Sequence, residues 1–340
     1  MPTAEDRFPL PRYPWPCTPH PDTEAFAQFE VDWLDEAFTF LPEGSIPTYQ
    51  AGFYSLSASH IRPYGSFDRV KPSVRYMVYG TILDDYYEFA DRDETEKAAD
   101  RLFYLFLGAA PIAQDNGLLR ICARAAQELT ALMPLDFMVR HAASMRDYVR
   151  CGPGRESVYR RARVFPSVEE CIAIRKLSIG VQPVLELGEV VMKRPLTPEL
   201  VRHPLITRMG SLIAAMAAYQ NDLFTWPREI TLIEQGEVMN TVLCVRHQWG
   251  LTLEQAHHYI LERNQQAIEE FEYLKNNLPD FGADTELVRE YITLISYIPN
   301  GWTAWYAQTK RYQSGGHPDV DWLVTDSESP SLDTSDSGGG

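Results

Sequence analysis

The sequence predicts an all-α protein in which one helical domain follows a proline-rich arm and precedes an acidic tail. Apolar residues recur at three- and four-residue spacing along several long segments, convincing period-two strands are scarce, and no long polar linker interrupts residues 22–313. A chain of 340 residues is long enough for two domains of ordinary size. Because helix punctuation recurs without a linker, we expect one domain, and two smaller helical domains are the alternative.

The two ends of the chain differ in composition from the middle. Seven prolines within the first 21 residues predict an extended N-terminal arm over residues 1–21. Residues 314–340 are rich in Ser, Gly and Asp and carry six acids without Lys or Arg, which predicts a disordered tail. Between them, the clearest helices are expected at Glu24–Phe40, Lys97–Leu107, Leu118–Met133, Glu199–Phe224, Leu253–Leu274 and Glu286–Gln308, and Gly180 is expected to stop a helix.

The charge balance excludes some partners. With 31 basic and 47 acidic residues the formal net charge is −16, which argues against binding nucleic acid or anionic membrane through bulk electrostatics. The longest strongly apolar stretch, Leu212–Tyr219, is too short to span a bilayer, and the N-terminus does not resemble a secretory signal. Five widely spaced cysteines without a CxxC pair indicate neither a disulfide framework nor a zinc site. We therefore expect a soluble cytoplasmic protein.

A first acidic cluster follows an apolar segment. In Asp84-Asp85-Tyr86-Tyr87-Glu88, the first and last acids lie one helical turn apart on the same face, where their carboxylates can converge on a hard cation such as Mg²⁺. Acids are frequent in this chain, so a cluster of this kind taken alone is more readily explained as a solvated helix face.

A second polar cluster continues from a segment that is apolar nearly all round. Asn221, Thr225 and Glu229 are spaced i, i+4 and i+8, which places an amide, a hydroxyl and a carboxylate along one helical stripe. Polar groups that continue from a buried helix need partners, and gathered oxygen atoms often bind a metal ion. The alternative is a helix that simply emerges into solvent at Gln220. Both clusters in one chain, in this order and on helices, are far less expected by chance than either alone.

Together these motifs resemble those of class I terpene synthases of the microbial single-domain type. The first cluster matches the aspartate-rich motif in its variant that ends in Glu, and the second matches the second metal motif, in which Ser or Thr occupies the middle position. Arg175 lies 46 positions before Asn221, where this family keeps an arginine that senses diphosphate. Arg311-Tyr312 matches the pair that closes the last helix, so the resemblance spans residues 22–313.

The resemblance implies a helical bundle around a central active-site cavity that holds an isoprenoid diphosphate. Three Mg²⁺ ions are implied, with ligands from both motifs: Asp84, Asp85, Glu88, Asn221, Thr225 and Glu229. It implies hydrogen bonds to the diphosphate from Arg175, Arg228, Arg311 and Tyr312. Arginine suits this task because its planar fork meets phosphate oxygens in pairs and keeps its charge. For Arg228 alone, a surface salt bridge is the simpler explanation.

The resemblance also implies a helix break after Arg175 that turns a backbone carbonyl, here that of Ile179, into the cavity. Ser178 occupies the linking position, where the family often has an acid. Trp302 and Trp305 are candidates to stabilise carbocations through cation–π attraction. The same aromatic spacing, like that of Phe53 and Tyr79, is equally explained by core packing.

The expected reaction is ionisation of farnesyl diphosphate and cyclisation of the carbocation to a sesquiterpene. A diterpene cyclase acting on geranylgeranyl diphosphate and a chain-elongating prenyltransferase are the enzymatic alternatives, and a helical interaction protein with a degenerate metal site is the non-enzymatic one. A di-iron bundle would need two Glu-x-x-His pairs, whereas the sequence offers Glu254 with His257. The resemblance allows a homodimer.

Overall fold

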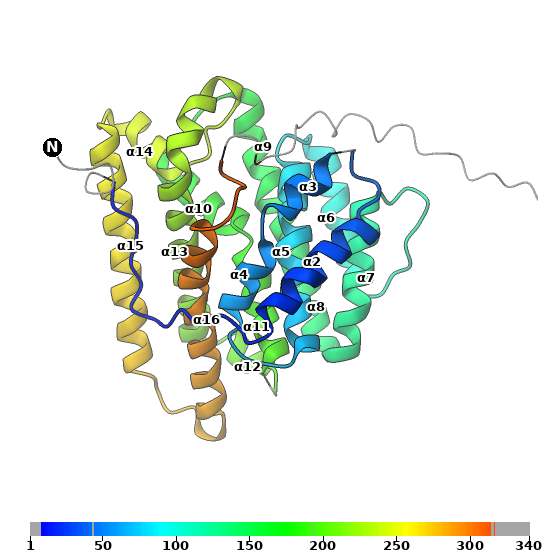
Figure 1. Ribbon diagram of the computed structural model, residues 1–340. Helices are drawn as coiled ribbons and strands as arrows, with labels where there is room; N and C mark the ends of the chain where they lie inside the picture. Colours follow the sequence, from blue (N-terminus) through cyan, green and yellow to red (C-terminus); the bar gives the residue numbers. More distant parts are fainter. Residues whose placement is uncertain (1–7, 43, 193, 314–315, 317–340) are drawn as a thin grey trace, which may run out of the picture.

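A computed structural model describes residues 8–42, 44–192, 194–313 and 316, and these residues form helices without any strand (Figure 1). This confirms the predicted all-α fold. The predicted disordered tail lies outside the described residues apart from Gly316, and so do the first seven residues of the predicted arm. Residues 8–22 contain no helix, and the first helix begins at Thr23.

The helices in chain order are α2 (Thr23–Ala37), α3 (Ser45–Gln50), α4 (Tyr54–Ile61), α5 (Phe67–Tyr87), α6 (Arg92–Phe106), α7 (Gly117–Leu132), α8 (Leu135–Cys151), α9 (Pro153–Ala162), α10 (Val168–Ser178), α11 (Val181–Val191), α12 (Pro198–Val201), α13 (Pro204–Glu229), the 3₁₀ helix η1 (Ile230–Gln235), α14 (Thr241–Trp249), α15 (Leu253–Asn276), the 3₁₀ helix η2 (Gly282–Asp284) and α16 (Thr285–Tyr306).

Short polar side chains begin several of these helices by accepting hydrogen bonds from their first free backbone N–H groups. Asp91 accepts from Glu94 N at the start of α6. Ser167 and Thr252 form reciprocal capping boxes at the starts of α10 and α15. Residues within a few positions of the chain therefore mark these helix starts.

The predicted helices agree with the observed ones except in one segment. The expected helix Glu199–Phe224 is two helices, because Pro204 occupies the first turn of α13 and its preceding residue, His203, is extended (ψ 129°). The long helix α13 then runs past Phe224 to Glu229 and includes Pro227. The expected stop at Gly180 is confirmed, since this residue has φ 67° between α10 and α11.

The central helix α13 packs against α10, α11, α14, α15 and α16, and α5 packs against α4, α7 and α11. Figure 1 shows the segment before α2 passing α15 and α16 as extended chain without regular secondary structure. Trp15 donates its indole N–H to Glu272 of α15 at 2.6 Å, and Asn300 of α16 donates to the carbonyl of Trp15. These contacts attach the segment to the outer surface of the helices.

No helix in the described part of the chain is both long and apolar enough to cross a membrane. All five cysteines lie in that part, and each is a free thiol.

Candidate active site

Two adjoining chambers lie among the helices. The polar chamber is lined by Asp84, Asp85, Glu88, Phe89, Arg160, Arg175, Asn221, Arg228, Glu229, Leu232, Gln235, Glu237, Met239, Arg311 and Tyr312. The apolar chamber is lined by Tyr76, Met77, Gly80, Thr81, Tyr148, Ser178, Ile179, Gly180, Val184, Trp302, Trp305 and Tyr306, together with five residues that it shares with the polar chamber: Asp84, Arg175, Asn221, Arg311 and Tyr312. The shared residues form the boundary between the charged chamber and one that holds no charged residue besides those it shares.

The acids of the first motif lie at the end of α5 and have different environments. Asp84 faces both chambers. Asp85 accepts two hydrogen bonds from the guanidinium of Arg311 and one from Tyr49 Oη at 3.0 Å. Glu88 forms an ion pair with Arg160 at 2.9 Å. The three carboxylates therefore belong to one cavity wall but are directed at separate partners.

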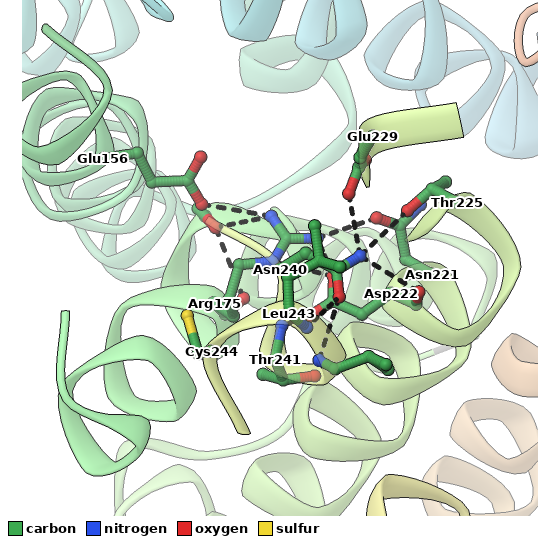
Figure 2. Close-up of polar contacts among 12 residues, drawn as sticks. Glu156, Arg175, Asn221, Asp222, Thr225, Glu229, Asn240, Thr241, Leu243 and Cys244 are labelled. Atoms are coloured by element: carbon green, nitrogen blue, oxygen red, sulfur yellow. Dashed lines mark hydrogen bonds and ion pairs between the residues drawn. The ribbon is translucent and has the colours of Figure 1, made fainter. Parts of the chain in front are cut away.

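The second motif lies on the last three turns of α13, and Figure 2 shows its side chains grouped around Asn240. Asn221 and Glu229 line the polar chamber, whereas Thr225 is buried. The amide nitrogen of Asn240 lies 2.7 Å from Glu229 Oε2 and 3.4 Å from Thr225 Oγ1. Its amide oxygen accepts from the first N–H groups of α14, so this residue joins the second motif to a helix start.

Arg175 is buried at the boundary of the two chambers and reaches the second motif directly (Figure 2). Its Nη2 donates to Asn221 Oδ1 and to Asp222 Oδ1, each at 2.7 Å. Its Nη1 donates to Glu156 Oε1 and to Ser178 Oγ, each at 3.1 Å. Both ends of the guanidinium are therefore held in place by protein oxygens.

Burial and neighbouring carboxylates raise the pKa values of two acids in the polar chamber. Burial, and then the carboxylates of Glu156 and Asp85, raise the pKa of Asp84 to about 7. Burial, and then Glu237 and Asp222, raise the pKa of Glu229 to about 7. Such carboxylates are stabilised in their ionised form when a cation binds beside them.

The oxygen donors of this chamber fit a hard divalent cation. Among the described residues, no three acidic, histidine or cysteine side chains converge closely enough to hold an ion by themselves. The reason lies in the partners of the first motif, since Arg311 holds Asp85 and Arg160 holds Glu88. The second motif adds the amide oxygen of Asn221 and the carboxylate of Glu229 to the oxygen atoms that line this chamber.

The apolar chamber contains the interruption between α10 and α11. Gly180 adopts the left-handed conformation there, and its carbonyl accepts a hydrogen bond from Tyr76 Oη at 2.7 Å. A methyl group added at this glycine would lie 2.7 Å from the same hydroxyl oxygen. Tyr148 Oη donates to the carbonyl of Gly80 at 3.0 Å on the facing helix. Two tyrosine hydroxyls thus fix the shape of the chamber wall.

All the metal-ligand, diphosphate-binding and catalytic residues expected from sequence line the two adjoining chambers except Thr225, which is buried and lines neither. Ser178, Ile179, Trp302 and Trp305 line the apolar chamber, and Arg228 and Tyr312 line the polar one. Trp305 is anchored through its indole N–H, which lies 2.6 Å from the carbonyl oxygen of Gly52. Phe53 and Tyr79 lie outside both chambers.

Several polar residues at the site were not predicted from the sequence. Glu156 and Arg160 of α9, Glu237 after η1 and Asn240 at the start of α14 belong to no motif that the sequence displays. The spacing of Glu156 and Arg160, four positions apart on a helix, is a weak signal that fits any exposed ion pair.

Solved structures share this fold. The linalool/nerolidol synthase from Streptomyces clavuligerus matches with a TM-score of 0.74 at 19% identity, over 87% of this chain and 99% of that chain. An α-eudesmol synthase matches with a TM-score of 0.73 at 18% identity, over 87% and 98% of the two chains. These likenesses show that the chain has the helical fold of class I terpene synthases.

Sequence comparison leads to a family. Residues 75–270 match the family described as "Terpene synthase family 2, C-terminal metal binding". The chain belongs to this terpene synthase family and is therefore a lyase that acts on isoprenoid diphosphates. The (+)-eremophilene synthase of Sorangium cellulosum is 23% identical over 305 residues, which cover 88% of this chain and 91% of that protein. The alpha-muurolene synthase of Coprinopsis cinerea is 27% identical over 322 residues, which cover 88% and 71%.

Proposed function

We propose that the protein is a Mg²⁺-dependent cyclase that ionises farnesyl diphosphate and closes the resulting carbocation to a sesquiterpene. The observation that carries this proposal is the direct junction of the two chambers. A charged space with four arginines and several carboxylates opens onto a space lined by five aromatic residues other than the shared Tyr312. A molecule with an anionic head and a hydrocarbon chain matches this division. The names of the two sequence relatives support a sesquiterpene product.

We assign the metal ions to the two motifs. Asp84, Asp85 and Glu88 on one wall and Asn221, Thr225 and Glu229 on the other would hold three Mg²⁺ ions. When bound, Mg²⁺ supplies Lewis-acid stabilisation of the departing diphosphate. Burial raises the pKa values of Asp84 and Glu229, which disfavours their ionised forms, and a bound cation would favour those forms again.

The arginines and Tyr312 have a different role in this proposal. Arg175, Arg228 and Arg311 line the polar chamber and, with the hydroxyl of Tyr312, donate hydrogen bonds to the diphosphate. Two of them, Arg175 and Arg311, also border the apolar chamber, so they hold the head of the substrate next to the chain that must fold. This placement keeps the allylic carbon at the boundary.

The wall of the apolar chamber guides the carbocation. Trp302 and Trp305 present indole rings to the chamber, and such faces attract a passing cation. Ser178 and Ile179 lie at the helix interruption, where the Ile179 carbonyl supplies a dipole near the boundary. The aromatic lining also excludes water, which would otherwise capture the cation early.

The test is incubation of the purified protein with Mg²⁺ and the C10, C15 or C20 diphosphate, followed by gas chromatography of the extract. We expect a cyclic C15 hydrocarbon or alcohol that forms only with the metal ion. Asn221→Ala, or Asp84→Ala together with Asp85→Ala, should abolish this turnover, and full activity in those variants would contradict the metal assignment. A product from the C20 substrate alone would identify a diterpene cyclase, and a requirement for isopentenyl diphosphate would identify a prenyltransferase.

A further inference from the structure

A continuous row of ion pairs links the two metal motifs through residues that belong to neither. It begins at Glu88 in the first motif, whose carboxylate pairs with Arg160 at 2.9 Å. Arg160 pairs in turn with Glu156 at 3.1 Å. Glu156 pairs with Arg175 at 3.1 Å, and Arg175 reaches Asn221 in the second motif. The two walls of the polar chamber are thereby connected by side chains in direct contact.

Glu156 is the central member of this row. Its side chain is almost fully buried, and each of its two oxygens accepts from a different arginine, Oε1 from Arg175 and Oε2 from Arg160. Burial alone would raise the pKa of this carboxyl, but the two arginines hold it below its ordinary value. Glu156 is therefore ionised, and it connects the arginine that contacts the first motif to the arginine that contacts the second.

Two glycines allow the backbone to bring this cluster together. A methyl group at Gly152, just before α9, would lie 2.7 Å from the Cα atom of Ser178. A methyl group at Gly236, after η1, would lie 2.6 Å from the carbonyl oxygen of Arg160. Cβ atoms do not come this close to other atoms. The end of α10 can therefore approach the start of α9, and the segment after η1 can approach its end, only because these two positions lack a Cβ. The cluster is a consequence of this close packing.

The contacts of Arg175 distinguish fixed partners from an exchangeable one. Asp222 and Glu156 are buried carboxylates that hold opposite ends of the guanidinium. Asn221 also accepts from Nη2, but its oxygen is a proposed metal ligand and lines the open chamber. If Asn221 held a metal ion, the N–H group of Nη2 that it now accepts from would be free for a diphosphate oxygen, and the two carboxylates would keep the guanidinium plane in place.

We propose that Glu156 is a positioning residue for the substrate diphosphate, because it orients Arg175 and, through Arg160, links Arg175 to Glu88 of the first motif. This inference rests on the proposed function, in which the polar chamber binds the diphosphate. Glu156 itself contacts neither substrate nor metal. It acts through the two arginines, and its carboxylate compensates their charge where Ser178 supplies only a hydroxyl.

The decisive variant is Glu156→Gln, which keeps the size of the side chain and removes its charge. We expect the affinity for inorganic diphosphate in the presence of Mg²⁺, measured by calorimetry, to fall by about tenfold to a hundredfold, the range of one charge-assisted hydrogen bond. We expect the KM for the isoprenoid diphosphate to rise by a similar factor. Glu156→Asp, which keeps the charge at a shorter reach, should recover part of both losses.

The matched control is Glu189→Gln. Glu189 is equally buried and pairs with Arg140 at 2.6 Å. Arg140 lines neither chamber, whereas Arg160 and Arg175, the partners of Glu156, both line the polar one. We expect this variant to lose stability while its diphosphate affinity stays within about twofold of the wild-type value. An unchanged affinity in Glu156→Gln, or equal losses in the two variants, would overturn the proposal. Should Glu156→Gln not fold, an unchanged diphosphate affinity in Glu156→Asp overturns it as well.

The link to the first motif has its own test. Because Glu156 and Arg160 are neighbours in one row of ion pairs, the double variant Glu156→Gln/Arg160→Gln should bind diphosphate no more weakly than the weaker-binding single variant. Losses that multiply would show that the two residues act independently. The failure of this inference is distinguishable from the failure of the proposed function: wild-type protein that binds diphosphate but converts no isoprenoid substrate refutes the function, whereas the comparison among variants still stands.

Discussion

Arg311 and Asp85, which lie 226 positions apart in the chain, form a two-pronged ion pair across the polar chamber. Arg311 Nη1 lies 3.0 Å from Asp85 Oδ2, and Nη2 lies 2.5 Å from Oδ1. Both side chains are buried, at 7% and 8% exposure. The pair fastens the end of the described chain after α16 to the first metal motif on α5.

Arg311→Met should destabilise the protein strongly, because it leaves the buried carboxylate of Asp85 without its guanidinium. We expect the free energy of unfolding, measured with urea, to fall by about 3–5 kcal/mol. The double variant Asp85→Asn/Arg311→Met should be more stable than Arg311→Met, since it also removes the uncompensated charge. As a control, Arg194→Gln breaks an exposed pair with Asp284 and should change stability by about 0.5 kcal/mol or less. Equal losses in Arg311→Met and Arg194→Gln would contradict this prediction.

The residues that the sequence could identify are those whose chemistry repeats at helical spacing. Asp84 with Glu88, and Asn221 with Thr225 and Glu229, were recognisable because a helix places such residues on one face whatever surrounds it. Helix starts with a local cap were predictable for the same reason. These features depend on neighbours within a few positions of the chain.

The remainder of the site depends on contacts between distant segments. Glu156 contacts Arg175 from another helix, and Glu237 reaches Arg160 from 77 positions away. Nothing within their own segments indicates these partners, because the approach depends on close backbone packing at Gly152 and Gly236. The break before Pro204 was missed because the apolar pattern continues across it, although the proline restricts the residue before it.

Asn240→Ser should lower the affinity of the second motif for Mg²⁺ while preserving the helix cap. Serine accepts hydrogen bonds from backbone N–H groups at a helix start, but it lacks the amide group that donates to Glu229 and Thr225. Loss of such an outer contact commonly weakens metal affinity by about tenfold or more. A Mg²⁺ titration of turnover should therefore show a half-maximal concentration about tenfold higher.

The control for this change is Asn116→Ser, the same substitution at the N-cap of α7. Asn116 caps α7 and, unlike Asn240, does not donate to Glu229 or Thr225, so the Mg²⁺ concentration for half-maximal turnover should stay at the wild-type value. The prediction is wrong if the two variants respond to Mg²⁺ alike.

Gly180→Ala should cost more stability than Gly250→Ala, although the two glycines have nearly the same backbone conformation. Their φ angles are 67° and 64°. A methyl group at Gly250 meets nothing within 4 Å, whereas one at Gly180 lies 2.7 Å from Tyr76 Oη and 3.1 Å from the ring of Tyr148. The left-handed conformation alone costs about 1–2 kcal/mol for alanine, so urea unfolding should show that loss for Gly250→Ala and a larger one for Gly180→Ala.

The same pair of variants should differ in catalysis. Tyr76 and Tyr148 line the apolar chamber, and both must move to accept a methyl group at Gly180. We expect Gly180→Ala to lower turnover and to change the ratio of products in the gas chromatogram, while Gly250→Ala keeps the wild-type pattern. Identical product ratios in the two variants would show that the helix interruption does not shape the chamber.

Glu30 should make stability depend on pH in a range where carboxylates are usually ionised. It caps the start of α4 from α2, because its oxygens accept from the backbone N–H groups of Tyr54 and Ser55 at 3.0 and 2.6 Å. Burial raises the pKa of Glu30 from 4.5 to about 7. Between these two values the folded protein keeps a proton that the unfolded chain has lost. Raising the pH through this range therefore lowers the free energy of unfolding.

Glu30→Gln removes this titration and tests the prediction. The glutamine oxygen can still accept one of the two backbone hydrogen bonds, and the side chain carries no charge at any pH. Unfolding with urea at a series of pH values from 4.5 to 7.5 should show the stability of wild type, relative to the variant, falling by about 3 kcal/mol as the pH rises. The contribution of Glu30 to the free energy of unfolding is fully present below pH 4.5, and it is lost as the pH rises through the folded pKa near 7. Parallel pH profiles for the two proteins would mean that Glu30 is ionised in the folded state throughout this range.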